Sequence, residues 1–446
     1  MQRLYCSKRS PHPREHSGCW RTWLLRGRSR SPRDLLSASF NALLGIAGQN
    51  TCSGTASFSI HPTCSSIETP PVTTPTCSAM TAVPADIDEK FKVAVVDFGD
   101  PDAPCKFTQS LKTTGFAVIT NHPVASPLIE EVYDEWRSFM KVLHEEAVRQ
   151  QEDSAKRPRL DDDNAAAPSN LSEKYFRRLD TQEGYFPMAS SEKAKGASVK
   201  DLKHYFQCYF PSTKYPEEVS DKAQKLWSEL VALGKQLVNW IDEYMPPDIK
   251  ATIQEKIGEG RMLSDCVSDT RTMLRILHYP GYKSGEEEVG AVRAAAHEDI
   301  NLITVLPAGS SRGLQVKSNQ SGEWYEVPMV RGSIVINIGD MLQEMCDGAY
   351  ISTTHRVVKV EEDGPKGAAT DDSNGGAFLT NDRMSTPCFI HLKKKCPVSK
   401  TYGSAEHYLR ERLVTLGVVP PAVLDGFIEE HPGGVMPGWD PAEDPN

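Results

Sequence analysis

The stretch GSIVINIGD, residues 332–340, decides the fold of this 446-residue chain. Its isoleucines fall at alternate positions, so one face of the segment is uniformly apolar, as in a β-strand that covers a core. Six further strand-like segments surround it, separated by Gly, Pro, Ser or Asn: RTMLRILHYP (271–280), NLITVLP (301–307), GLQVKS (313–318), WYEVPM (324–329), HRVVKV (355–360) and STPCFIHL (385–392). This spacing predicts an all-β barrel or a double-sheet jelly roll.

The region before residue 265 follows a different pattern. Two short β-branched runs, FKVAVVDF (91–98) and GFAVITNH (115–122), predict strands. Apolar residues recur at helical spacing after Ser126, and again from about residue 220 to Pro246, so we expect two amphipathic helices there. The fold class is therefore mainly β with flanking helices (α+β), with a largely helical N-terminal region.

Two polar stretches interrupt these patterns. Residues 147–170 and residues 361–380 lack periodicity, which is typical of disordered insertions. We therefore expect an N-terminal region over 86–265 and a jelly-roll region over 266–400, each with one insertion. A C-terminal helix, centred on the stretch from 404 to 416, and a tail complete the chain over 401–446.

Residues 1–85 differ from the rest in composition. They are rich in Ser, Thr, Pro and Arg, and the first 80 residues hold nine of the 50 basic residues but only three of the 60 acidic ones. Such an acid-poor segment is typical of an organellar transit peptide, and the alternative is a disordered or untranslated extension ahead of Met80. We expect a cytoplasmic protein, or a mitochondrial or plastid one if the segment is a transit peptide.

Charge and hydropathy exclude several classes of protein. With 39% hydrophobic and 25% charged residues, the chain has the composition of a globular protein. Its net charge of −10 becomes −16 once the first 80 residues are set aside, so the remainder lacks the basic surplus that nucleic-acid binding needs. No apolar run approaches the roughly 18 to 20 residues of a membrane span. We therefore expect neither nucleic acid nor a membrane as a partner.

The sequence His297-Glu298-Asp299, followed by His355 after 55 intervening residues, is the most informative pattern. On a strand, alternate side chains share a face, so His297 and Asp299 would point the same way. A histidine from a distant strand could complete a 2-His-1-carboxylate triad, which leaves open positions on a non-heme Fe(II) ion. On spacing alone, surface histidines or a zinc hydrolase site would fit equally well.

A second pair of residues strengthens the metal hypothesis. Arg383 and Ser385 are two apart on a predicted strand, so they also share a face. A guanidinium with a neighbouring hydroxyl can hold a carboxylate in two places, whereas an unpaired buried carboxylate costs several kcal/mol. Because the pair follows the histidine pattern, we favour carboxylate binding over an arginine on the surface.

From about residue 93 to residue 416 the chain resembles the isopenicillin N synthase-like family of Fe(II)/2-oxoglutarate-dependent dioxygenases. In the N-terminal half the resemblance rests on VAVVDFGDP (93–101), TTGFAVITNHPV (113–124) and EGYFPMASSEKAKGASVKDLKHYF (183–206). In the C-terminal half it rests on LRILHYP (274–280), AAAHEDINLITVLP (294–307), the run from Gly313 to Val358, and DRMSTPCFIHL (382–392). The resemblance implies a double-stranded β-helix, or jelly-roll, core.

The resemblance also implies roles for individual residues. The iron ligands, which are the catalytic centre, would be His297, Asp299 and His355. The far carboxylate of 2-oxoglutarate would be held by Arg383 and Ser385, with help from Tyr279. The element Asn337-x-Gly339-Asp340 matches a structural motif that leads toward the third ligand.

The chain departs from the family pattern at one point. Plant members have Asn-x-Tyr where this chain has Leu277-His278-Tyr279, so a polar contact to the co-substrate is missing or is supplied by His278. We interpret His278 as a core residue and exclude it from the metal ligands. For substrate contacts the sequence offers three weak candidates: Tyr205, Phe206 and Tyr209.

The activity implied by the resemblance is hydroxylation or desaturation of a small organic substrate with release of succinate and CO₂. It would use Fe(II), 2-oxoglutarate and O₂, with ascorbate as reductant. Asp299 argues against halogenation, because related halogenases carry a small residue there. Two alternatives remain open: an iron oxidase of the same family that does not use 2-oxoglutarate, of the isopenicillin N synthase or ethylene-forming type, and a non-catalytic scaffold protein. The sequence indicates neither the substrate nor the oligomeric state.

Overall fold

A computed structural model describes the fold for most of the chain after residue 90. The described residues are 91–156, 170–178, 182–188, 201–281, 292–359 and 382–442. The predicted N-terminal extension, the predicted insertion at 361–380 and most of the insertion at 147–170 lie outside them.

Helices and strands alternate through the first half of the described chain, and strands dominate the second. The helices are α1 (Ala103–Thr114), α2 (Ser126–Lys156), α3 (Leu171–Lys174), α4 (Lys222–Tyr244), α5 (Pro247–Ile257), α6 (Asp340–Met345), α7 (Ala405–Thr415) and α8 (Ala422–Glu430). The strands are β1 (Ala94–Asp97), β2 (Phe116–Thr120), β3 (Gly184–Phe186), β4 (His204–Tyr209), β5 (Val267–Tyr279), β6 (Ala294–His297), β7 (Ile303–Pro307), β8 (Leu314–Lys317), β9 (Trp324–Glu326), β10 (Ile334–Ile338), β11 (His355–Val357), β12 (Arg383–Ser385) and β13 (Cys388–Leu392).

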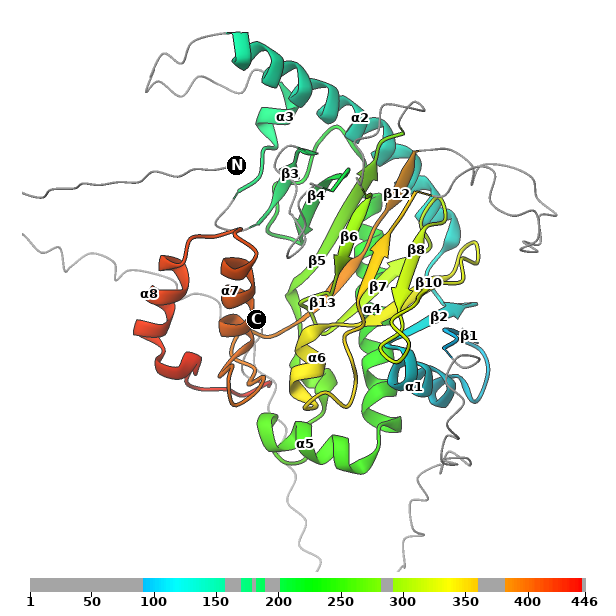
Figure 1. The fold of residues 1–446 in the computed structure, drawn as a ribbon, viewed down its shortest axis with the longest axis vertical. Helices are drawn as coiled ribbons and strands as arrows, with labels where there is room; N and C mark the ends of the chain where they lie inside the picture. The colour runs from blue at the N-terminus through cyan, green and yellow to red at the C-terminus, as the bar shows by residue number, and fades with distance from the viewer. Residues whose placement is uncertain are drawn as a thin grey trace, which may run out of the picture. The chain divides into compact units, whose positions relative to one another are not determined.

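Two sheets form the β core (Figure 1). The larger sheet has the order β1-β2-β10-β7-β13-β5-β4-β3, with β12 also paired to β5, and the smaller has the order β6-β11-β8-β9. Among these strands only β1 and β2 pair in parallel. Strands that are distant in sequence are neighbours, as β10 is between β2 and β7, which is typical of a jelly roll. The predicted fold class, mainly β with flanking helices, is confirmed.

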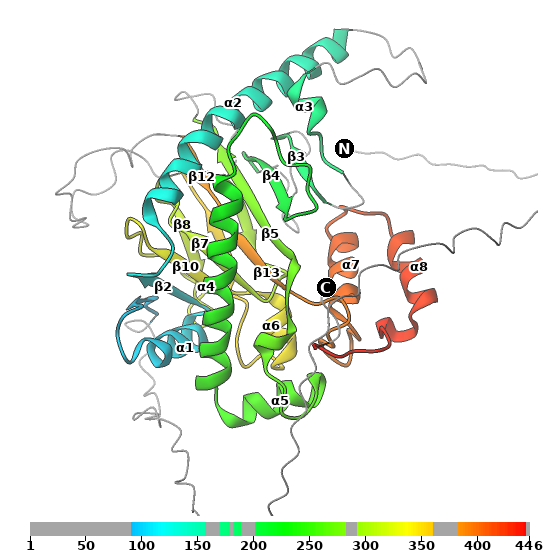
Figure 2. The same ribbon diagram turned by 180° about the vertical axis from the view of Figure 1, so that it is seen from behind.

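Helix α4 covers one face of the larger sheet (Figure 2). Its apolar stripe, which includes Leu226, Leu230 and Leu237, is fully buried in the main core. At Gly234 the helix comes so close to β13 that a Cβ atom would lie 2.8 Å from the side chain of Ile390. The absence of a side chain at this position therefore sets the distance between helix and sheet.

The predicted insertion at 147–170 was placed too early in the chain. Helix α2 continues to Lys156 instead of ending near residue 146. This part of α2 is polar and lacks the apolar periodicity on which the prediction relied, but Glu145 pairs with Arg149 one turn later. The carboxylate of Glu146 also accepts a hydrogen bond from the backbone N–H of Ser172, which connects α2 to α3. Charge pairing and this contact support a helix that hydrophobic spacing does not reveal.

The C-terminal helix predicted at 404–416 is confirmed as α7, and Ser404 caps it by accepting a hydrogen bond from the backbone N–H of His407. Helices α5 and α8 were not predicted. Each begins beside a proline pair, Pro246-Pro247 for α5 and Pro420-Pro421 for α8, and only the first pair had been used, as the end of the preceding helix. Within the described residues, no helix is both long and apolar enough to cross a bilayer.

Candidate metal centre and cavity

The three predicted metal ligands lie together at one end of the smaller sheet. Strands β6 and β11 pair with His297 directly opposite His355, and the two imidazole ring centroids are 4.4 Å apart. Strand β6 ends at His297, so Asp299 reaches the same place from the following turn and not by alternation along the strand. One potential ligand atom from each of the three residues lies within 4.8 Å of the others.

Backbone carbonyls orient both imidazoles. The Nδ1 atom of His297 lies 2.7 Å from the carbonyl oxygen of Ala295, and that of His355 lies 3.2 Å from the carbonyl oxygen of Thr353. A carbonyl only accepts, so each Nδ1 carries the proton and donates it. Each Nε2 is then an acceptor, and both Nε2 atoms lie 3.8 Å from Oδ1 of Asp299.

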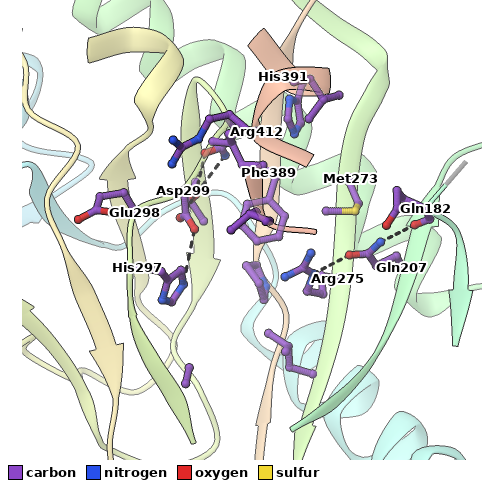
Figure 3. A pocket seen from close by; sticks show the side chains of 18 of the residues that line it. Gln182, Gln207, Met273, Arg275, His297, Glu298, Asp299, Phe389, His391 and Arg412 are labelled. Atoms are coloured by element: carbon purple, nitrogen blue, oxygen red, sulfur yellow. Dashed lines mark hydrogen bonds and ion pairs between the residues drawn. The ribbon is translucent and has the colours of Figure 1, made fainter. Parts of the chain in front are cut away.

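The carboxylate of Asp299 is held from behind by two neighbouring strands. Its Oδ2 accepts hydrogen bonds from Oγ1 of Thr304 on β7, at 2.6 Å, and from Nδ2 of Asn337 on β10, at 2.9 Å. These bonds leave Oδ1 facing the two imidazoles. Figure 3 shows Asp299 beside His297. Hydrogen bonds of this kind fix the direction of a metal-ligating carboxylate.

Burial and charge prepare His297 and Asp299 to bind a cation. Burial, followed by the charge of nearby His355, lowers the pKa of His297 to about 4. Burial by itself would raise the pKa of Asp299, but His355, His297 and the bonds from Thr304 and Asn337 outweigh it and lower the pKa. At neutral pH His297 is therefore neutral and Asp299 is charged. Imidazole nitrogens with one carboxylate oxygen suit a divalent first-row metal such as Fe(II), so the residues fit the expected ion.

Arg383 presents a buried positive charge to the same cavity. It lies opposite Tyr279 in the β12–β5 pair, with its guanidinium carbon 5.1 Å from the centre of the tyrosine ring. Its Nε donates to the carbonyl oxygen of Ser311 at 3.1 Å, but its Nη1 is buried without a hydrogen-bond partner among the described residues. A buried guanidinium with one nitrogen that lacks a hydrogen-bond partner favours an anionic ligand. Gly309 makes room for it, since a Cβ atom there would lie 2.6 Å from Nη2.

One cavity of about 920 Å³ is lined by all of the residues predicted to bind the metal and the co-substrate. The cavity-lining residues near the metal ligands include Arg383, Ser385 and Tyr279. Farther along, the lining comes from one face of β4, β5 and β13 and from α7 and α8 (Figure 3). This second part combines apolar side chains, such as Met273 and Phe389, with polar ones.

The three substrate candidates have different positions. Tyr209 lines the cavity, whereas Phe206 was wrongly included: it is fully buried in the main core, with its ring centroid 5.3 Å from that of Trp136. Tyr205 does not line the cavity and stacks on Phe186. The reason is the two-residue period of β4, which directs Phe206 to the opposite face from its neighbours.

The polar cavity residues that sequence reasoning missed include Arg275 and Gln207. They are cross-strand neighbours on β5 and β4, and the Nε of Arg275 donates to Oε1 of Gln207 at 2.8 Å. The same alternation that places Leu277 and Tyr279 in the cavity could have identified Arg275. His278, in contrast, is buried and does not line the cavity, so it does not replace the missing polar contact.

The motif Asn337-x-Gly339-Asp340 orients a candidate metal ligand and supports the backbone around the site. Asn337 contacts Asp299, as described above, while a Cβ atom at Gly339 would lie 2.1 Å from the carbonyl oxygen of Asn301. Asp340 accepts a hydrogen bond from the hydroxyl of Tyr408 at 3.1 Å and so connects α6 to α7. The structural role predicted for the motif holds for Gly339 and Asp340, and Asn337 in addition orients a candidate ligand.

A jelly roll in which two histidines and an aspartate converge in one cavity is typical of proteins that bind a single metal ion there. The family model of the 2OG-Fe(II) oxygenase superfamily matches residues 271–392. A protein from Shewanella oneidensis that is provisionally named an oxygenase has a similar crystal structure, with 37% sequence identity, a TM-score of 0.55, and coverage of 74% of this chain and 100% of that one. The chain belongs to the 2OG-Fe(II) oxygenase superfamily.

Curated relatives are similar over shorter stretches. Feruloyl CoA ortho-hydroxylase 1 of Arabidopsis thaliana is 28% identical over 43% of this chain and 46% of its own length. Scopoletin 8-hydroxylase of the same plant is 27% identical over 56% of this chain and 60% of its own length. The chain thus spans about half the length of these relatives. A full-length Neurospora crassa protein, solved in complex with alpha-KG, shares the fold at 20% identity and a TM-score of 0.51, covering 74% of this chain and 98% of that one.

Proposed function

We propose that the protein is an Fe(II)- and 2-oxoglutarate-dependent dioxygenase that hydroxylates or desaturates a small organic substrate, with release of succinate and CO₂. One observation carries the proposal: the three converging ligand atoms and the buried guanidinium of Arg383 face the same cavity. Membership of the superfamily and relatives named as hydroxylases support it.

In this proposal His297, Asp299 and His355 hold the iron. Their Nε2 atoms and Oδ1 are the atoms that the surrounding hydrogen bonds leave available. Bound iron, together with 2-oxoglutarate and O₂, supplies the oxidising chemistry, and ascorbate keeps the metal reduced. The protein contributes the position of each group and the electrostatic environment.

Arg383 binds the distal carboxylate of 2-oxoglutarate in this proposal. The unpartnered Nη1 offers a charge-assisted hydrogen bond, and Ser385, which faces the same cavity two residues later, adds a hydroxyl. Tyr279 fixes one face of the guanidinium through a cation–π contact. With its distal carboxylate bound by Arg383, the co-substrate would point its keto and adjacent carboxylate groups toward the metal ligands.

Apolar side chains line part of the cavity wall on the metal side. Phe116 packs edge-on against the imidazole of His355, with ring centroids 5.6 Å apart, and Leu277, Leu306 and Val357 line the same cavity. Reactive groups that are shielded from water undergo fewer side reactions. The part lined by β4, β5, β13, α7 and α8 is left for the substrate.

A coupled assay tests the proposed function. Purified protein with Fe(II), 2-oxoglutarate and ascorbate is screened against flavonoids, phenolic CoA thioesters, diterpenes, amino acids and peptides, and succinate is measured together with product. We expect one succinate per product molecule for at least one substrate. Product formed without 2-oxoglutarate would instead indicate an oxidase of the isopenicillin N synthase type. Failure to bind both Fe(II) and 2-oxoglutarate would exclude the proposal and favour a non-catalytic member.

A further inference from the structure

A chain of four polar residues, three of them buried, lies directly behind the strand that carries Arg383. The hydroxyl of Tyr185 is 3.1 Å from Nδ1 of His204, and Nε2 of His204 is 2.8 Å from Nδ1 of His278. Nε2 of His278 is in turn 3.1 Å from Oδ2 of Asp382. Tyr185, His204 and His278 are at most 1% exposed. None of the four residues lines the cavity.

The carboxylate at one end gives this chain a single direction. Asp382 can only accept when ionised, so His278 donates from Nε2 and accepts at Nδ1. His204 must then donate from Nε2 and accept at Nδ1, where the hydroxyl of Tyr185 donates. With both imidazoles neutral, every ring nitrogen has one partner and none is left over. Burial lowers the pKa of His204 well below its ordinary value, which agrees with this assignment.

These four residues lie on the face of the β5–β12 pair that is turned away from the proposed co-substrate site. In the antiparallel β5–β12 pair, Arg383 lies opposite Tyr279, Met384 opposite His278, and Ser385 opposite Leu277. Because side chains alternate, the first and third of these positions face the cavity, whereas the middle one faces the opposite side. Asp382 precedes Arg383 and belongs to the reverse side.

Asp382 connects three elements at the end of β12 where Arg383 lies. Besides the bond from His278 on β5, its carboxylate lies 3.2 Å from Nζ of Lys141 and 3.4 Å from Nη1 of Arg137, both on α2. Burial by itself would raise the pKa of Asp382, but the hydrogen bond from His278, followed by the neighbouring cations Lys141 and Arg137, lowers it to about 2. The carboxylate is therefore ionised at any working pH.

Different groups hold the middle of β12 and the residue just before it. Strand β12 has only three residues, and at Met384 it exchanges hydrogen bonds with Ser310, whose Oγ accepts from the Met384 backbone N–H at 2.8 Å. On the N-terminal side, the side chain of Asp382 makes the contacts to β5 and α2. A small shift of a binding group can cost far more affinity than its own contacts suggest.

We propose that Asp382 and His278 are positioning residues for the co-substrate: they hold the start of β12 so that the guanidinium of Arg383 meets the distal carboxylate of 2-oxoglutarate. The inference rests on the proposed function. Residues that only stabilise the fold would have similar contacts. The two roles differ in their variants: loss of a positioning residue lowers the affinity for 2-oxoglutarate, whereas loss of a purely structural residue lowers only the stability.

The test compares binding of 2-oxoglutarate to the Fe(II)-loaded full chain without O₂, by calorimetry. We expect Asp382→Ala to raise the dissociation constant about tenfold, because it removes a charge-assisted hydrogen bond and the contacts to α2. Asp382→Asn keeps an acceptor for His278 and loses the charge, so we expect about a threefold rise. Iron binding should stay unchanged in both variants. In turnover assays the KM for 2-oxoglutarate should rise, while kcat at saturating 2-oxoglutarate stays within about twofold.

Asp242→Ala is the matched control. Asp242 is a buried carboxylate that accepts hydrogen bonds from the backbone N–H groups of Leu263 and Ser264, each at 2.8 Å, and does not line the cavity. Its loss should lower stability and leave the affinity for 2-oxoglutarate unchanged.

Wild-type affinity in Asp382→Ala, or a loss no larger than in the Asp242 control, would overturn the inference. If Asp382→Ala does not fold, Asp382→Asn decides, and unchanged binding there overturns it. A wild-type protein that binds no 2-oxoglutarate refutes the proposed function, which is a different result.

Discussion

Two pairs of histidines in this molecule share their local structure and differ in what their nitrogens do. His297 lies directly opposite His355 in one antiparallel pair of strands, and His204 lies directly opposite His278 in another. The ring centroids are 4.4 Å apart in the first pair and 4.8 Å in the second. Each pair also has an aspartate close by, Asp299 or Asp382.

The difference lies in the Nε2 atoms. In the cavity pair, backbone carbonyls occupy both Nδ1 atoms, and neither Nε2 has a hydrogen bond among the described residues. In the core pair, His204 and His278 use all four ring nitrogens in bonds to each other, to Tyr185 and to Asp382. Convergent nitrogens without hydrogen bonds indicate a place for a ligand, whereas fully bonded ones indicate a structural network.

The largest expected effect separates the two pairs directly. His297→Ala should abolish stoichiometric Fe(II) binding and succinate formation, because two ligands cannot replace three in a site of this type. His204→Ala should keep Fe(II) binding and instead lower the free energy of unfolding by about 1 to 3 kcal/mol, since it leaves buried partners without hydrogen bonds. Metal content and denaturant unfolding measure the two effects. Equal loss of iron in both variants would contradict the comparison.

The next largest effect concerns Arg383, the buried cation that faces the cavity. Arg383→Leu should weaken binding of 2-oxoglutarate about 100-fold while Fe(II) binding remains, because it removes a charge-assisted pair inside the cavity. Arg383→Lys should recover only part of the affinity, since an ammonium group cannot reproduce the planar fork of donors. Calorimetry on the Fe(II)-loaded protein checks both variants. An affinity close to wild type in Arg383→Leu would mean that another residue binds the co-substrate.

A smaller effect should come from the bonds behind Asp299. Asn337→Ala removes one of the two donors to its Oδ2, and we expect Fe(II) affinity to fall about 10- to 100-fold, as for other residues that orient metal ligands. Asn301→Ala is a useful comparison, because Asn301 contacts Thr304 and the backbone but does not bond the carboxylate directly. If Asn337→Ala and Asn301→Ala lower the Fe(II) affinity equally, the loss comes from disturbing the segment between β6 and β7 and not from losing the Asn337–Asp299 bond.

The sequence predicts the cavity pair and identifies His278 as a core residue, but it misses the pairing of His278 with His204, for physical reasons. His297, Asp299 and His355 follow a spacing that the chemistry of an iron site restricts, and Arg383 with Ser385 follows the two-residue period of a strand. The proximity of these residues in the structure agrees with that reading.

His204 and His278 carry no such signal, because their contact depends on the register between β4 and β5. That register is set by packing across two sheets, which local patterns do not contain. The polar end of α2 escaped prediction for a related reason, since its support comes from charge pairs and from Ser172 on a different helix.

The smallest expected effect is the pH dependence of the stability that Asp382 contributes. The pKa of Asp382 is lowered to about 2 in the folded protein, below its ordinary value of 3.8. A lowered carboxyl pKa stabilises the fold above the unfolded pKa, and this contribution is lost as the pH falls toward the folded pKa. Asp382→Asn should therefore be less stable than wild type by about 1 kcal/mol near pH 6, and the difference should shrink between pH 5 and pH 3.

Chemical denaturation at several pH values measures this difference. Asp221→Asn serves as the control, because the ion pair of Asp221 with Lys225 is exposed and should contribute little at any pH. A stability difference for Asp382→Asn that stays constant down to pH 3 would mean that the carboxylate charge does not hold β12 to α2. The core histidine network would then rest on hydrogen bonding alone, and the contrast with the cavity pair would lie only in the geometry of the ring nitrogens.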